Sequence, residues 1–196
     1  MTTLDLVIAL ANERRARPIP DVIETPRLIL RASKASDLAE SYAASLESVD
    51  ALKAWMPWAH PAPNLESMRN YFNKVEDDWD ARTTVDFQWL DRATGQLVGK
   101  GGFHHIEWQH PRVEVGYWLR SSVIGHGYCT EAVNALTDYA KTHLGAVRAE
   151  IRSAVENAAS RAVAERCGYA LEGVMKRSVM RGDGSLCDGC LYAKVF

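Results

Sequence analysis

Two closely spaced glycines, Gly125 and Gly127, lie between a strand-like segment and a long stretch of helical periodicity. At the start of such a helix several main-chain N–H groups point at one spot, supported by the positive end of the helix dipole. Glycine lets the main chain approach an anion without an intervening side chain. His126 can add a donor or a positive charge, and Thr130 a hydroxyl. The pattern predicts a site for a phosphate or diphosphate group, with an ordinary tight turn as the alternative.

The loop differs from two better-known phosphate-binding motifs. No Gly-Lys-Ser/Thr follows the glycines, which excludes a Walker-type loop. The third glycine of the dinucleotide-binding fingerprint is also missing.

Glu114 is the acid in the otherwise apolar segment Val113–Leu119, which makes it a candidate general base. Strand alternation places it opposite Val113 and Val115, so a solvated surface residue is the alternative interpretation. Cys129 is not predicted to be a nucleophile, because the only acid–base partner near it in sequence is His126.

The sequence holds four cysteines, of which Cys187 and Cys190 form a C-x-x-C pair. A zinc site needs further ligands at matching spacing, and Cys129 and Cys167 are too far apart to supply a second pair. Residues three apart in a regular strand also point to opposite faces. We therefore predict no metal, with a zinc or redox site at the C-x-x-C pair as the less favoured alternative.

The chain has 196 residues and a formal net charge of −2. A general nucleic-acid-binding protein needs a strong basic excess, so this class is excluded. No apolar run approaches the roughly 20 residues of a membrane span. The N-terminus lacks the basic and apolar regions of a secretory signal, and we expect a cytoplasmic protein.

The periodicity predicts the elements that must position these residues, in an α/β (α+β) arrangement. Residues 1–22 are expected to be an N-terminal extension with a short helix, followed by one domain over 23–196. Helices are expected with Leu38, Tyr42 and Leu46 on one face, over Leu65–Trp79, after Gly127, and from Asn157 to before Gly168. The predicted strands are 26–31, 84–90, 97–106, 112–119, 147–152, 169–179 and 186–195.

The glycine loop gains specificity from the segments around it. These are Thr25–Arg31, Trp55–Trp58, Val113–Leu119, Asn157–Ser160 and Ala164–Tyr169. In this order they resemble the GNAT superfamily of N-acetyltransferases, specifically its RimJ/RimL branch, which acetylates N-terminal amines of ribosomal proteins. The resemblance runs from about Thr25 to Phe196. The family loop has the pattern Gln/Arg-x-x-Gly-x-Gly/Ala, and here Ile124 and Cys129 depart from it while Gly127 is kept.

The resemblance implies a single-domain GNAT fold, with a mixed, mostly antiparallel sheet of about seven strands flanked by helices. Acetyl-CoA, the implied co-substrate, would lie between two splayed strands, Arg112–Leu119 and Val147–Arg152. Its pantetheine arm would pair with the main chain near Val115, Gly116, Tyr117 and Trp118, and contact Asn157. Its pyrophosphate would lie on the loop formed by Gly125, His126, Gly127, Tyr128, Cys129 and Thr130.

The resemblance also assigns roles in catalysis. Glu114 would be the base, acting through a water molecule, and Ser160 would protonate or stabilise the CoA thiolate. Other branches use a tyrosine one turn later, where this sequence has Ala164. The acceptor side can be lined by Trp55, Trp58 and His104. His104 and His105 point in opposite directions if their strand is regular, so that at most one reaches the site.

We therefore expect an N-acetyltransferase whose acceptor amine attacks acetyl-CoA directly in a ternary complex. The acceptor is expected to be a protein N-terminus of ribosomal-protein type. Alternatives are a small amine (an antibiotic, aminoacyl nucleotide or polyamine) or a non-catalytic CoA-binding module. The protein is expected to be a monomer or homodimer, with no nucleic-acid or membrane partner.

Overall fold

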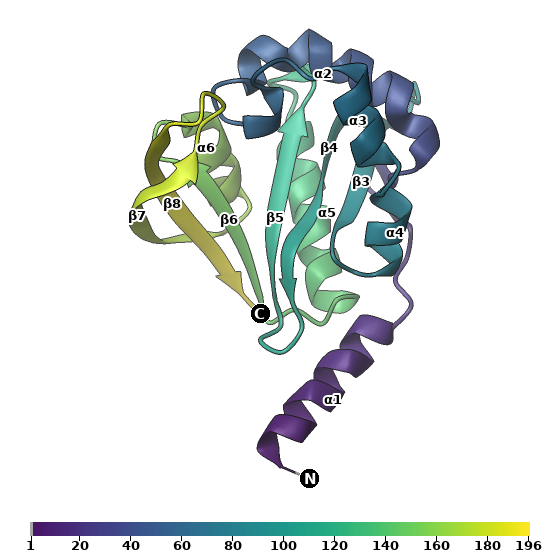
Figure 1. The fold of residues 1–196 in the computed structure, drawn as a ribbon, viewed down its shortest axis with the longest axis vertical. Helices are drawn as coiled ribbons and strands as arrows, with labels where there is room; N and C mark the ends of the chain where they lie inside the picture. Colours follow the sequence, from purple (N-terminus) through teal and green to yellow (C-terminus); the bar gives the residue numbers. More distant parts are fainter. Residues whose placement is uncertain (1) are drawn as a thin grey trace.

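The computed structural model describes residues 2–196, and in this part of the chain eight strands form one mixed sheet (Figure 1). The strands are β1 (Val22–Glu24), β2 (Leu28–Ala32), β3 (Val85–Asp91), β4 (Leu97–Glu107), β5 (Arg112–Leu119), β6 (Arg148–Ala154), β7 (Ala170–Met180) and β8 (Leu186–Val195). Their spatial order is β1-β2-β3-β4-β5-β6-β8-β7. Neighbours are antiparallel except β5 and β6. The predicted GNAT-type sheet of about seven strands is confirmed, with β1 as an additional edge strand.

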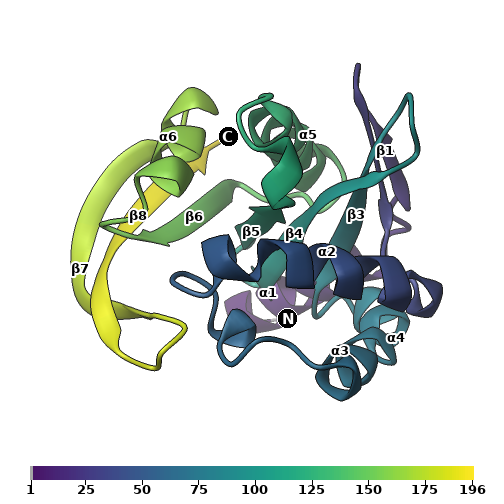
Figure 2. The same ribbon diagram turned by 90° about the horizontal axis from the view of Figure 1, so that it is seen from above.

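The hydrophobic core lies between the sheet and α5 (Tyr128–Thr142). Alternate residues of β3, β4 and β5 point to this side, as strand periodicity requires. Phe103 stacks on Tyr139 of α5 with ring centroids 5.8 Å apart. Helix α6 (Ala158–Arg166) continues this layer over the C-terminal strands (Figure 2).

The opposite face of the sheet carries α2 (Leu38–Leu52), α3 (Leu65–Phe72) and α4 (Val75–Asp80). Two predictions fail here. The expected helix over Leu65–Trp79 is interrupted at residues 73–74 and forms α3 and α4. The buried side of α2 consists mostly of small residues, whereas the predicted Leu46 is exposed. The reason is that α2 packs against a polar strand position, where Ser41 donates a hydrogen bond to buried Gln88.

Strands β5 and β6 form a V that is open toward α2 (Figure 1). They pair only between residues 112–114 and residues 148–150, after which no pairing continues. One main-chain edge of β5 therefore has no strand partner beyond Glu114. The gap between the two strands is the feature around which the site is built.

Helix α1 (Thr3–Ala16) stands beside the sheet rather than on it (Figure 1). It is attached through its C-terminal end, where the Arg15 guanidinium donates to the Ala81 carbonyl at 2.7 Å. The division into an extension and a domain stays a prediction. No helix in residues 2–196 is both long and apolar enough for a membrane span.

Candidate active site

The loop before α5 presents a row of free main-chain donors. Gly125 and Gly127 have φ values of +90° and +80°, a conformation that glycine adopts without strain. Gly127 caps α5 without a side-chain hydrogen bond. Within residues 2–196, no acceptor is found for the main-chain N–H groups of residues 125–130. Such a row at the start of a long helix is suited to holding an anion such as a diphosphate.

Contacts from the N-terminal strand region hold this loop in place. Arg27 donates to the His126 carbonyl at 2.8 Å and to the Glu131 carboxylate at 2.6 Å. Its guanidinium carbon lies 4.8 Å from the centre of the Tyr128 ring. Burial raises the pKa of Glu131, but hydrogen bonds from Thr25 and Arg27 outweigh this and hold it below its ordinary value. No local sequence pattern predicts this anchoring role for Arg27.

The side chains of Cys129 and Thr130 are engaged in different ways. Burial raises the pKa of the Cys129 thiol, so that it stays protonated at neutral pH and is a poor nucleophile. The Thr130 hydroxyl accepts a hydrogen bond of 3.2 Å from Arg166, at the end of α6. Arg166 therefore brings a positive charge to the loop, which the sequence analysis did not anticipate.

A cavity of about 540 Å³ opens between the splayed strands and the helices α2 and α3. It collects most of the side chains predicted for the site: Trp55, Trp58, His104, Glu114, Val115, Gly116, Tyr117, Trp118, Asn157 and Ser160. The predicted phosphate loop, residues 125–130, is not part of its lining. The cavity and the loop are thus two separate parts of the candidate site, connected by β5.

Ser160 lies at the start of α6, facing β5 across the gap. Its main-chain N–H donates to the Asn157 side chain at 3.1 Å, which is the predicted N-cap. Its hydroxyl lies 3.1 Å from the Tyr117 hydroxyl, which also donates to the Ser160 carbonyl at 3.2 Å. Burial raises the pKa of Tyr117, which therefore remains a neutral donor. The family resemblance predicts only main-chain contacts for Tyr117, because the sequence does not reveal which side chain faces Ser160.

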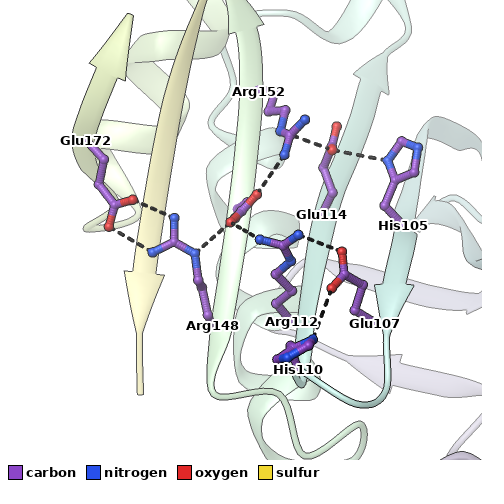
Figure 3. A network of polar contacts seen from close by, with 9 residues as sticks. His105, Glu107, His110, Arg112, Glu114, Arg148, Arg152 and Glu172 are labelled. Carbon is purple, nitrogen blue, oxygen red and sulfur yellow. Dashed lines mark hydrogen bonds and ion pairs between the residues drawn. The ribbon is translucent and has the colours of Figure 1, made fainter. Parts of the chain in front are cut away.

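Glu114 belongs to a network of charged side chains at the base of the V (Figure 3). Its Oε2 atom lies 3.2 Å from His105 Nδ1 and 3.5 Å from Arg152 Nε. Arg152 also contacts Glu150, which is buried and further paired with Arg148. Burial raises the pKa of Glu150, but the two arginines lower it more, so that it remains ionised.

The regular strand on which opposite directions of His104 and His105 depend is not present. Strand β4 is irregular between His104 and Glu107, and His105 has a φ of +47°. The resulting bulge turns His105 toward Glu114, which is also the cross-strand neighbour of His104. Only His104 lines the cavity, where a side chain at position 116 would collide with its ring.

The cavity lining combines aromatic walls with one buried polar cluster. The rings of Trp58 and Trp118 lie 5.8 Å apart. Lys100 lies 3.0 Å from the Asp86 carboxylate and 2.6 Å from the Tyr71 hydroxyl. Burial lowers the pKa of Lys100, while burial of Asp86 is outweighed by the lysine charge, so the pKa of Asp86 is also lowered. The pair is therefore a buried ion pair with its hydrogen bonds satisfied.

The cavity is lined by the carboxylate of Glu114 and by the hydroxyls of Tyr117 and Ser160. These groups lie near the edge of β5 that has no strand partner. A carboxylate can accept a proton, and a hydroxyl can donate one to a leaving group. Free main-chain N–H groups can stabilise a developing oxyanion. These are the elements of an acyl transfer to a nucleophile.

Two relatives stand out among curated proteins. The ribosomal-protein-serine acetyltransferase of Escherichia coli is 30% identical over 142 residues, covering 67% of this chain and 79% of its own. YdaF of Bacillus subtilis, a candidate ribosomal N-acetyltransferase, is 33% identical over 119 residues, or 59% of this chain and 64% of its own. The match to YdaF thus spans less than two thirds of that relative.

Among solved structures, RimL, a ribosomal-protein α-N-acetyltransferase in complex with coenzyme A, has the same fold, with a TM-score of 0.83. It is 24% identical, and the match covers 89% of this chain and 98% of RimL. The model of the acetyltransferase (GNAT) domain family matches residues 27–170. The chain therefore belongs to the GNAT family of acetyltransferases.

Proposed function

We propose that this protein transfers the acetyl group of acetyl-CoA to the N-terminal amine of another protein, in a ternary complex of both substrates. The observation that supports this proposal is the unpaired edge of β5. This edge connects the free N–H groups of residues 125–130 with the cavity lined by Glu114 and Ser160. The loop suits the diphosphate of the cofactor, and the strand edge suits its amide-containing pantetheine arm.

The proposed reaction assigns each group a step. Glu114 takes a proton from the acceptor ammonium, through a water molecule, since only the free amine is nucleophilic. Free N–H groups of β5 stabilise the oxyanion that forms on the acetyl carbonyl. Ser160, hydrogen-bonded to Tyr117, donates toward the sulfur as the thiolate leaves. Direct attack avoids an acyl-enzyme, in line with the protonated, partly buried Cys129.

The acceptor class follows from the relatives rather than from the cavity. The Escherichia coli relative is named for acetylating a serine of a ribosomal protein. We propose a ribosomal protein or a similar polypeptide N-terminus as the acceptor, and the cytoplasm as the place of the reaction.

A small amine is a second candidate acceptor. The observation in its favour is that the cavity end near Trp58 and Trp118 is bounded by aromatic side chains. Flat apolar walls suit a planar ligand group at least as well as an extended peptide.

The test is release of free CoA thiol from acetyl-CoA in the presence of candidate acceptors. The panel contains peptides with serine or alanine N-termini, polyamines, aminoglycosides and aminoacyl nucleotides. Activity with the peptides supports the proposal, and loss of activity in Glu114→Gln supports the assigned base. If acetyl-CoA protects the protein against thermal unfolding but no acceptor leads to release of CoA thiol, the protein is instead a CoA-binding module.

A further inference from the structure

The bulge in β4 gives His105 an unusual main-chain conformation. Between the pairs His104–Glu114 and Glu107–Arg112, two residues of β4 face a single residue of β5. His105 has a φ of +47°, in the left-handed region that glycine or asparagine occupies more readily. Strained positions and bulges of this kind are concentrated near functional sites. The effect here is to bring the imidazole onto the same side of the sheet as Glu114.

The contact between His105 and Glu114 joins the cavity to the solvent. Glu114 lines the cavity, and its side chain is 22% exposed, whereas the side chain of His105 is 80% exposed. His105 Nδ1 lies 3.2 Å from Oε2 of the carboxylate. The second carboxylate oxygen, Oε1, has no hydrogen-bond partner within residues 2–196 and remains free for a ligand or a water molecule.

Other charged groups surround the pair and orient the Glu114 carboxylate (Figure 3). Arg152 approaches the same oxygen as His105, at 3.5 Å, but its charge is shared with Glu150. The charged and titratable groups that face the pair are His104 and Glu107 on β4, Arg112 on β5, and Glu150 and Arg152 on β6. Arginine cannot release a proton at neutral pH, so of the two partners of Glu114 only the histidine can carry one away.

We propose that His105 carries the proton of the acceptor ammonium from Glu114 to the solvent. The inference rests on the proposed function, with Glu114 as the base. Converting an ammonium and acetyl-CoA into an amide and free thiol removes two protons from nitrogen. The nitrogen bonds to the acetyl carbon and the carbon–sulfur bond breaks, leaving its electron pair on sulfur. One proton ends on that sulfur, and the other must leave the site.

The proton that Glu114 takes from the ammonium passes to Nδ1 of His105, and the ring then releases a proton from Nε2 to bulk water. Histidine suits this step because it takes up and releases protons near neutral pH. His105 acts through Glu114 and is therefore a positioning residue with a proton-transfer role, not a group that touches the acceptor.

The testing variant is His105→Asn, because asparagine tolerates the left-handed conformation but cannot carry a proton. The matched control is His110→Asn. His110 is as exposed as His105, lies 3.9 Å from Glu107 and does not contact Glu114. In weak buffer, His105→Asn is expected to lower kcat on the order of tenfold, with KM for acetyl-CoA unchanged. Added imidazole is expected to restore kcat, and His110→Asn to behave as the wild type.

Two outcomes would overturn the inference while leaving the proposed function intact. One is a wild-type kcat and pH profile in His105→Asn. The other is a loss that imidazole does not restore, which would show that His105 only holds Glu114 in place. A wild-type protein that releases no thiol with any acceptor would instead overturn the proposed function, and this inference with it.

Discussion

The hydroxyl groups of Tyr117 and Ser160 lie 3.1 Å apart, although their elements, β5 and α6, stand on opposite sides of the gap in the sheet. This contact places a partly buried pair of hydroxyls at the wall of the cavity.

Replacement of either hydroxyl is expected to affect turnover rather than cofactor binding. Ser160→Ala and Tyr117→Phe should each lower kcat by about tenfold or more, because the thiolate then leaves without its donor. The Kd for acetyl-CoA should change by less than about twofold, since the main-chain contacts remain. Steady-state thiol release and calorimetric titration measure the two quantities. Tyr139→Phe, which removes a hydroxyl bound to the Pro20 carbonyl far from the gap, is the control.

The loop glycines provide a test of the phosphate site. Gly125→Ala forces a residue with a Cβ into a φ of +90°, at a strain of about 1–2 kcal/mol. We expect the Kd for acetyl-CoA to rise by about tenfold, because the loop N–H groups lose their arrangement. Gly184→Ala in the β7–β8 turn, with a φ of +82° and equally open surroundings, imposes the same strain elsewhere. Equal affinities in the two variants would contradict a phosphate site at Gly125.

The contact of Glu131 with Thr25 and Arg27 should make stability depend on pH. Because the folded-state pKa of Glu131 is lowered, its stabilisation is present above the ordinary glutamate value and is lost as the pH falls through the folded value. Glu131→Gln is expected to lower the free energy of unfolding by ~2 kcal/mol at pH 7. The difference from the wild type should shrink below about pH 4.5. Urea unfolding between pH 3 and 7 measures it, and a constant difference over this range would refute the assignment.

Trp58 offers a test of the acceptor side. Its ring lies against Trp118 at the cavity and is partly exposed. Trp58→Ala should raise KM for the acceptor while leaving KM for acetyl-CoA unchanged, because the proposed cofactor site lies along β5 and the loop. Trp58→Phe should recover part of the loss through the remaining aromatic surface. An equal rise in KM for the acceptor and in KM for acetyl-CoA would indicate that Trp58 supports the fold instead.

Much of the fold was predictable from local patterns. Residues 112–119 form β5 with the predicted bounds, since their alternation and the flanking polar residues are local signals. β1 was missed because three residues give too short a pattern, and the strand exists through its pairing with residues 29–31 of β2. The buried side of α2 was mispredicted because Ser41 is buried against Gln88, a contact between distant segments.

For the candidate site, residue types and order were sufficient to predict the glycine loop, Glu114 and Ser160 as parts of one site and to identify the family. These predictions rest on local sequence patterns, namely glycine before a helix, an acid in an apolar strand and a capped helix start. The interaction partners of these groups could not be predicted from such local patterns. His105 reaches Glu114 only through a bulge, Tyr117 reaches Ser160 only across the gap, and Arg27 holds the loop from the connection between β1 and β2. Such contacts join residues that are distant in the chain, and their geometry arises only when the sheet and its helices pack together.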